Sequence, residues 1–357
     1  MKIGIVTQPL RANYGGILQN YALQQVLKRM GHEVWTIDYN KYDWARWTDC
    51  AWRAVAHKML GHKVKFPMTP TRRAQQERPL RRFVDKYIAL TEPRTRVLEL
   101  DIVTKYAFEA IVVGSDQVWR PRYNYDVKDC FLKFAKGLPL RRVAYAASFG
   151  TDEWEFTKRQ TAKCAALAKT FNGISVREKS GVGLCRQNLG VDAVHVLDPT
   201  LLLHGADYAE LCNDIPKRRP FVFAYILDES EEKQRQVKDF ARRMGLDYFI
   251  KSADASVNMD DSVELWLSYF RDAAFVITDS FHGTAFSINF NKDFYAFGNA
   301  DRGNSRFDSL LGAFGLEDRL IGNEIPTAGK AISWEEINEK RGKELTASTA
   351  WLKEMMG

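Results

Sequence analysis

The stretch "FVITDSFHGTAFSINF", Phe275 to Phe290, joins two apolar segments through a short polar turn. Its first four residues predict a buried strand, and apolar residues return at helical spacing after the turn. Between them lie a carboxylate, a hydroxyl and an imidazole at Asp279, Ser280 and His282. A turn needs polar side chains for solvation, and any short ones would serve. The meaning of these three therefore depends on what the rest of the chain places around them.

The same strand–turn–helix order recurs along the chain. A strand pattern from Lys2 to Gln8 is followed by a helical pattern from Gly16 to Met30, which Gly31 ends. Further passages from a helix through a glycine into a strand occur at Gly190 and Gly245. Repeated strand–helix–strand units predict parallel sheets that are covered by helices on both faces.

The expected strands fall into two groups, separated by a polar, basic and proline-containing break at Asn213 to Pro220. The expected strands are 2–8, 32–39, 109–114, 142–148, 174–177 and 193–197 before the break, and 221–227, 247–252, 274–279 and 293–298 after it. We therefore predict an α/β fold with two doubly wound, Rossmann-like domains facing a cleft, over residues 1–212 and 213–325. A final helix within 326–357 should pack back on the first domain, and its opening at Ser333 is typical of a capping box.

Composition limits the classes of protein that fit. The chain has 357 residues with 45% hydrophobic and 27% charged content, which is ordinary for a globular protein. No apolar stretch reaches the roughly 20 residues that cross a bilayer, and the opening residues predict a core strand and no signal peptide. The five cysteines are scattered without a close pair, which favours reduced thiols in the cytoplasm. A net charge of +7 attracts anions such as phosphorylated metabolites, anionic lipid or nucleic acid.

Polar residues gather where the expected strands end, which is where open parallel sheets bind ligands. The candidate residues in these turns are Asn13, Gly15, Gly16, Ser115, Asp116, Gln117, Arg177, Lys179, Ser280, His282 and Gly283. A further polar turn is expected at 299–302. The glycine pair at 15–16, placed before a helix, would leave N–H groups at the helix start open to an anion. Each turn alone has a structural explanation, but their recurrence at strand ends indicates a site.

Several common sites are absent from the sequence. It contains no G-x-G-x-x-G, no P-loop and no H-E-x-x-H, so dinucleotide, P-loop nucleotide and zinc-protease sites lack their signatures. It also contains no D-x-D pair for a metal-bound nucleotide sugar and no G-x-S-x-G esterase turn.

Five segments, in their order and spacing, resemble the polysaccharide pyruvyl transferase family. They are "NYGGILQNYAL", "VVGSDQVW", "SVREKSG", "VLDPTLLL" and "TDSFHG", and the resemblance runs from about Lys2 to Gly298. It implies a glycosyltransferase-B-like pair of domains, with the acceptor on the first and the donor on the second. It also implies that Arg177 and His282 line the donor site. Some family members carry an arginine two residues before that histidine, where this chain has Ser280.

The activity that the resemblance implies is transfer of a pyruvyl group from phosphoenolpyruvate to two hydroxyls of a sugar. The product is a cyclic ketal on a surface polysaccharide, an exopolysaccharide or its lipid-linked precursor. The residue types fit this chemistry, because an enol phosphate becomes electrophilic when its methylene carbon is protonated. His282 suits the general acid, Asp116 the base for the sugar hydroxyl, and the cations of Arg177 and Lys179 the donor's anionic groups. The scheme requires no metal and no cofactor.

Two other interpretations stay open. A glycosyltransferase-B enzyme that uses a nucleotide sugar would share the two domains and bind a nucleoside diphosphate in the second. A non-catalytic module for polyanions ranks below both enzymes, because no nucleic-acid motif is present and aromatic residues do not interleave with the basic clusters. The expected partners are phosphoenolpyruvate and a sugar, oligosaccharide or lipid-linked glycan, and not nucleic acid. Contact with an anionic membrane surface is a further option, which would place a cytoplasmic protein at the inner face of the membrane.

Overall fold

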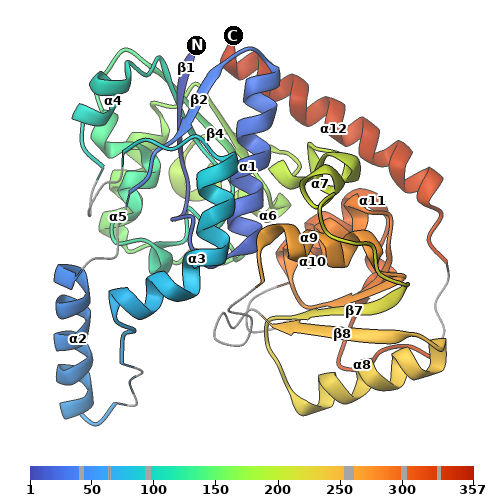
Figure 1. Cartoon of the computed structure of the whole chain (residues 1–357). Coiled ribbons are helices and arrows are strands. Elements are labelled where there is room, and N and C mark those ends of the chain that lie inside the picture. Colours follow the sequence, from blue (N-terminus) through green and yellow to red (C-terminus); the bar gives the residue numbers. More distant parts are fainter. Residues whose placement is uncertain are drawn as a thin grey trace.

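The computed structural model describes residues 1–39, 44–62, 64, 66–92, 98–252, 261–298, 304–327 and 331–357. Two parallel sheets form two α/β halves of the molecule (Figure 1). The expected turn at 299–302 lies outside the described residues.

The first sheet has six strands in the order β2-β1-β3-β4-β5-β6. These strands are β1 (Lys2–Val6), β2 (Glu33–Thr36), β3 (Ala110–Val113), β4 (Arg141–Ala147), β5 (Gly173–Val176) and β6 (Val194–His195). The second sheet has five strands in the order β11-β10-β9-β7-β8. They are β7 (Phe221–Ile226), β8 (Asp247–Ser252), β9 (Phe275–Thr278), β10 (Asp293–Phe297) and β11 (Leu320–Ile321). All neighbouring strands pair in parallel, and every expected strand is present, β8 with the expected ends and the others with shifted ends.

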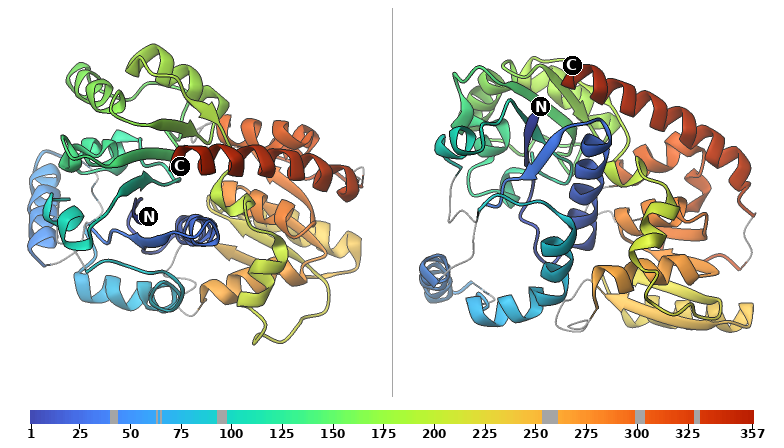
Figure 2. Two further views of the ribbon diagram at one scale, coloured as in Figure 1. Left: turned by 90° about the horizontal axis from the view of Figure 1, so that it is seen from above. Right: turned by 45° about the horizontal axis from the view of Figure 1, so that its top comes forward.

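Helices connect the strands and cover both sheets (Figure 2). In the first half they are α1 (Tyr14–Arg29), α2 (Trp44–Met59), α3 (Pro70–Tyr87), α4 (Asp101–Tyr106), α5 (Lys158–Ala168), α6 (Lys179–Leu184) and α7 (Gly205–Leu211). The others are α8 (Glu231–Met244), α9 (Val263–Asp272), α10 (Phe281–Asn289), α11 (Ser305–Phe314) and α12 (Trp334–Met356). None of the helices in the described part of the chain combines the length and apolarity that a membrane span needs.

The central strands are short apolar runs that lie inside the molecule. All four residues of β3 and all four of β9 are buried, as expected for parallel strands covered on both faces. One apolar core continues across the two halves, and the ring of Tyr14 on α1 stacks on Trp266 of α9 with a centroid distance of 5.2 Å. This shared core holds the carboxyl ends of the two sheets at a defined separation.

The last helix, α12, runs along both halves (Figures 1 and 2). Its Ser348 hydroxyl accepts a hydrogen bond of 3.0 Å from the N–H of Leu197, and Leu352 and Met356 are buried against the first sheet's core. The expected capping box at Ser333 is wrong, because that side chain makes no capping hydrogen bond. The helix is instead fixed by its apolar face.

Candidate active site

A cavity of about 250 Å³, the more closed of two that adjoin, lies between the carboxyl ends of the two sheets. Its walls come from the turns after β1, β3, β7, β9 and β10. The lining residues are Ala12, Asn13, Gly15, Asp116, Gln117, Arg120, Tyr123, Tyr225, Leu227, Asp279, Ser280, Phe281, His282, Arg306 and Phe307. The cavity therefore occupies the place where doubly wound α/β proteins bind their ligands.

The imidazole of His282 sits on this wall in the first turn of α10. It packs against Gly15, where a Cβ atom would lie only 1.9 Å from its Nδ1, so only glycine at position 15 allows this approach. Its Nε2 lies 3.9 Å from Oδ2 of Asp198 and has no hydrogen-bond partner among the described residues. Burial lowers the pKa of His282 to about 4, against a smaller raising effect of Asp198. The imidazole is therefore neutral near pH 7 in the free protein.

A buried ion pair lies behind the histidine. The Arg177 guanidinium donates a hydrogen bond of 2.9 Å to Asp198 and lies 3.4 Å from Glu178. Burial alone would lower the pKa of Arg177, but the carboxylates of Glu178 and Asp198 raise it above its ordinary value. Burial likewise opposes ionisation of Asp198, while Arg177 and His282 hold its pKa below the ordinary value. The site thus contains a fixed negative charge close to the imidazole.

Asp116 forms part of the cavity wall opposite α10. It follows β3 and adopts a left-handed backbone conformation with φ of 72°, which is uncommon for a residue with a side chain. Its Oδ1 accepts a hydrogen bond of 2.8 Å from the N–H of Gln117, and a Cβ at Gly16 would lie 3.0 Å from its Oδ2. Such strained positions cost about 1–3 kcal/mol and often occur at functional sites.

Arg306 supplies a cation to the cavity. It lies in the first turn of α11, and its Nε is buried without a hydrogen-bond partner among the described residues. Burial and the nearby Arg177 lower the pKa of Arg306 to about 10, so it stays protonated near neutral pH. The other cavity arginine, Arg120, is instead paired with both carboxylate oxygens of Glu155 at 2.9 Å. Of these two cavity cations, Arg306 is the one without a bound carboxylate in the described part of the chain.

The glycine pair at 15–16 does not precede the helix as expected. Helix α1 begins at Tyr14, and both glycines lie in its first turn, with the Asn13 side chain accepting a hydrogen bond from Gly16 N–H at 3.2 Å. Gly15 serves the approach of His282 instead of opening N–H groups to an anion. Asn13, Gly15 and Gly16 nevertheless all line cavities.

Four other candidate residues do not meet the cavity as the sequence suggested. Lys179 has an exposed side chain and is not part of the cavity lining. Ser115 is buried outside the lining, and its hydroxyl donates a hydrogen bond of 2.9 Å to Asp198. Gly283 is also outside the lining and faces strand β9, since a Cβ there would lie 2.2 Å from the Thr278 hydroxyl oxygen. Ser280 lines the cavity, but its hydroxyl caps α10 by accepting from the N–H of Gly283 at 3.2 Å.

A second, more open cavity of about 780 Å³ adjoins the first. The two share part of their walls, namely Ala12, Asn13, Asp116, Gln117 and Tyr123. The larger cavity is basic on its outer side, where Arg11, Arg46 and Arg73 lie. Its size and position suit a larger ligand that reaches into the closed cavity past Asp116.

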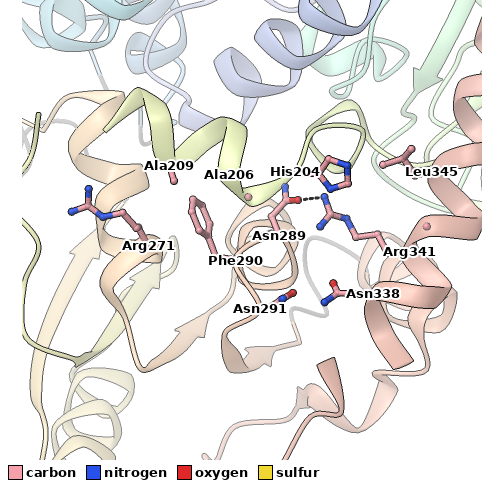
Figure 3. A pocket seen from close by; sticks show the side chains of 12 residues that line it. His204, Ala206, Ala209, Arg271, Asn289, Phe290, Asn291, Asn338, Arg341 and Leu345 are labelled. Carbon is pink, nitrogen blue, oxygen red and sulfur yellow. Dashed lines mark hydrogen bonds between the residues drawn. The ribbon is translucent and has the colours of Figure 1, made fainter. Parts of the chain in front are cut away.

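A third cavity, of about 460 Å³, lies between α7, α10 and α12 (Figure 3). Its arginines hold the fold together. Arg341 donates to the carbonyl oxygen of Leu203 at 2.6 Å and to the Asn289 side chain, and Arg271 is paired with Asp272 at 2.7 Å. Across the described part of the chain, no group of three His, Cys, Asp or Glu side chains is placed to hold a metal ion. The two adjoining cavities are therefore the candidate active site.

Two residues of the site were not among the candidates. Asp198 belongs to the segment "VLDPTLLL", and its contact with His282 spans positions that are far apart in the sequence. Arg306 lies in the first turn of the helix after β10, so the rule that ligands bind beyond strand ends could have found it.

The pKa of His282 makes a prediction for stability. A histidine with a pKa of about 4 in the folded chain and 6.5 when unfolded takes up a proton on unfolding between those two pH values. The free energy of unfolding should therefore decrease as the pH falls from 6.5 to 4, by an amount on the order of 2 kcal/mol for this residue. Urea unfolding of wild type and His282→Gln across this range measures it, and equal slopes for the two proteins would contradict the buried neutral imidazole.

Comparison with solved structures defines the class of fold. Arabidopsis thaliana UGT89C1 complexed with UDP-L-rhamnose matches with a TM-score of 0.52 and 10% identity, over 99% of this chain and 98% of that one. UDP-GlcNAc 2-epimerase from Neisseria meningitidis bound to UDP-GlcNAc matches with a TM-score of 0.49 and 8% identity, over 99% and 94%. The chain is thus a two-domain protein of the glycosyltransferase-B-like class, and the predicted fold class is confirmed.

The sequence family is equally defined. The polysaccharide pyruvyl transferase family matches residues 13–302, and the chain belongs to that family. A search of curated proteins found no match.

Proposed function

We propose that this protein transfers a pyruvyl group from phosphoenolpyruvate to two hydroxyls of a sugar in a surface polysaccharide, an exopolysaccharide or a lipid-linked precursor. Family membership supports a transferase that acts on polysaccharides. The observation that supports the donor is the cation of Arg306, which has no bound carboxylate among the described residues and lines the same cavity of about 250 Å³ as the imidazole of His282. A small donor with a carboxylate and a phosphate fits such a site.

In this proposal each of the two adjoining cavities binds one of the two substrates. The donor occupies the closed cavity next to Arg306, and the acceptor sugar occupies the larger, open cavity. Asp116 lines both cavities, so its carboxylate is placed where the sugar hydroxyl meets the donor. The donor's cavity is the more closed of the two, which would limit the water that competes with the sugar for the donor.

The reaction needs one proton on the donor and removes two from the sugar. His282 protonates the methylene carbon of the enol phosphate, and the resulting cationic centre is attacked by the first hydroxyl, whose proton passes to Asp116. The second hydroxyl then displaces phosphate, forming the ketal, and its proton leaves with the products. No metal or cofactor takes part in this scheme.

The protonation of His282 requires the donor. In the free protein burial lowers the pKa of His282 to about 4. At neutral pH its imidazole is therefore unprotonated and cannot act as a general acid. A bound phosphate or carboxylate adds negative charge near the ring and raises the pKa of the imidazole. Asp198, 3.9 Å from Nε2, stabilises the same protonated form. Donor binding thereby prepares the acid.

The geometry favours a different role for Arg177. Its side chain is 2% exposed, and its guanidinium pairs with Asp198 and Glu178 and lies over the Phe281 ring at 4.4 Å. It is not part of the cavity wall in the free protein. We propose that Arg177 positions Asp198 behind His282, and that Arg306 takes the direct contact with the donor's anionic groups. Arg306 would then take the role of the arginine that some family members have at the position of Ser280.

The reaction is tested by incubating the protein with phosphoenolpyruvate and a panel of sugars and lipid-linked acceptors. Phosphate release and a product mass increased by a pyruvyl ketal support the proposal. A parallel panel of uridine and guanosine diphosphate sugars tests the nucleotide-sugar transferase that the fold also permits. If the protein turns over a nucleotide sugar but does not turn over phosphoenolpyruvate, the proposed donor is wrong. We place the reaction in the cytoplasm, in keeping with the free cysteines.

Replacing Arg306 by Ala should weaken phosphoenolpyruvate binding by about 1.5–3 kcal/mol, the worth of a charge-assisted hydrogen bond. Among the described residues no carboxylate is bound to Arg306, so its loss should leave the melting temperature almost unchanged. Isothermal titration calorimetry measures the affinity, and Arg306→Lys should keep part of it. Arg235→Ala, at an exposed arginine on α8, is the matched control. Donor affinity that is equal in wild type and Arg306→Ala would exclude the contact.

A further inference from the structure

Helix α2 exposes an unusual amount of apolar surface. Trp44 is 55% exposed, Trp52 73% and Met59 85%, and Leu60 directly after the helix is 74% exposed. Trp44, Trp52 and Met59 follow each other by eight and seven residues, so they share one face of the helix. Ala54 is the one fully buried residue of the helix. Soluble monomeric proteins seldom expose several large apolar side chains on one face of a helix.

The same segment carries positive charge. Between Trp44 and Met68 the sequence has five Lys or Arg residues and one Asp. Arg53 and Lys58 are exposed on α2, and the Lys58 ammonium lies 6.0 Å from the centre of the Phe66 ring. Phe66 itself is 55% exposed. Tryptophan and long aliphatic side chains beside lysine and arginine are the composition of helices that lie in a membrane interface.

The helix stands apart from the rest of the first half, at its outer edge in each view (Figures 1 and 2). The Trp47 ring donates a hydrogen bond of 3.1 Å to the carbonyl oxygen of Pro67, in the connection between α2 and α3. Arg46 and Cys50 of α2 line the open cavity that adjoins the catalytic one. One helix therefore borders both the solvent and the expected acceptor site.

We propose that α2 docks this protein on an anionic lipid bilayer. The helix lies parallel to the surface, with Trp44, Trp52, Met59 and Leu60 in the boundary between headgroups and acyl chains. Arg53 and Lys58 contact the anionic headgroups through their flexible side chains. Each buried apolar side chain and each cation near the surface adds to the affinity.

A bilayer fits this face better than a second copy of the chain. The helix has 16 residues, which makes it about 24 Å long. An exposed stripe of roughly 10 Å width gives an area on the order of 250 Å², well below the ~800 Å² per partner of a stable protein interface. A lipid surface needs no complementary shape, so a short, convex helix face suffices.

If the proposed function holds, docking would bring the open cavity close to acceptors that are anchored in the membrane. A lipid-linked sugar has its lipid in the bilayer and its sugar in the water layer above it. With α2 on the membrane, such a sugar would reach the open cavity along the helix that carries Arg46 and Cys50. The acceptor is then the lipid-linked precursor in the membrane and not the finished polysaccharide.

Vesicle flotation tests the docking without any donor or acceptor present, so its outcome does not depend on the reaction. Wild type should float with vesicles of phosphatidylglycerol and phosphatidylcholine, and at least tenfold less with phosphatidylcholine alone. The triple variant Trp44→Ser, Trp52→Ser, Met59→Ser should lose at least tenfold of the binding. Arg53→Glu with Lys58→Glu should lose it as well, while keeping the apolar face.

The matched control removes exposed apolar side chains elsewhere, by Tyr125→Ser, Met244→Ser and Tyr248→Ser, which are 73%, 44% and 43% exposed in wild type. It should float like wild type, and all variants should keep the circular dichroism spectrum. Wild type that stays free of anionic vesicles, or an α2 variant that floats equally well, would overturn the proposal. So would a wild-type dimer in sedimentation that the α2 variant converts to a monomer, because α2 would then be a protein interface.

Discussion

Replacing His282 by Gln lowers turnover by about 10²–10⁴-fold, the usual contribution of proton transfer by a positioned side chain. Donor affinity and the melting temperature stay close to those of wild type, because the Nε2 atom makes no hydrogen bond that the fold depends on. Phosphate release at saturating phosphoenolpyruvate and acceptor measures the effect. In wild type, the pKa seen in the turnover profile should lie above about 4, since bound donor raises it from the value of the free protein.

The matched control is His204→Gln, at the histidine of the third cavity (Figure 3). Its turnover should remain within a factor of about two of wild type, because that cavity takes no part in the reaction and surface changes are nearly neutral. A His282→Gln protein that is destabilised but turns over normally would make His282 a structural residue. Equal loss in both variants would indicate a general effect on the fold.

Replacing Arg177 by Ala lowers the free energy of unfolding by about 3–5 kcal/mol, the effect of removing one partner of a buried ion pair. The carboxylate of Asp198 has no exposed side-chain surface and would remain with hydrogen bonds from Ser115 and Thr200 only. The unpaired charge would raise the pKa of Asp198 and withdraw the negative charge that faces His282. Turnover should therefore decrease together with stability. Urea unfolding at pH 7 measures the first effect.

An exposed pair provides the comparison for Arg177. Arg242 is 79% exposed and pairs with Asp239 at 2.9 Å, so Arg242→Ala should change stability by less than about 1 kcal/mol. The two roles of Arg177 are separable by experiment. A variant that loses donor affinity at unchanged stability would restore the direct anion contact that the sequence suggested. A large loss of stability with a donor affinity near that of wild type supports the positioning role.

Much of the fold could be predicted from local patterns. Buried strands such as β3 and β9 are continuous apolar runs, and glycines end the helices before the next strands, so strand and helix alternate visibly in the sequence. Helix starts were less accurate. Gly15 and Gly16 lie inside α1, and Ser333 makes no capping hydrogen bond, since helix ends depend on neighbours that the local sequence does not contain. No helix was expected at α2, whose exposed apolar face is atypical of a globular protein.

The site was predictable only in part. Asp116 and His282 line one cavity, as their places after β3 and β9 suggested, because parallel strands bring their carboxyl ends to one edge. The contributions of Asp198 and Arg306 were not foreseen. Whether Arg177 meets a ligand or another side chain depends on burial, and burial is a property of the assembled chain.

The sequence by itself determined the alternation of strands and helices, the two groups of strands and the family, because these depend on residues close together in the chain. Only the tertiary structure decided that His282 is buried and neutral, that Arg177 is paired, and that the Nε of Arg306 has no partner among the described residues. The physical reason is that pKa values and ion pairs depend on distances of a few ångströms between residues that are far apart in sequence. These distances are set only when the two sheets pack on their shared core.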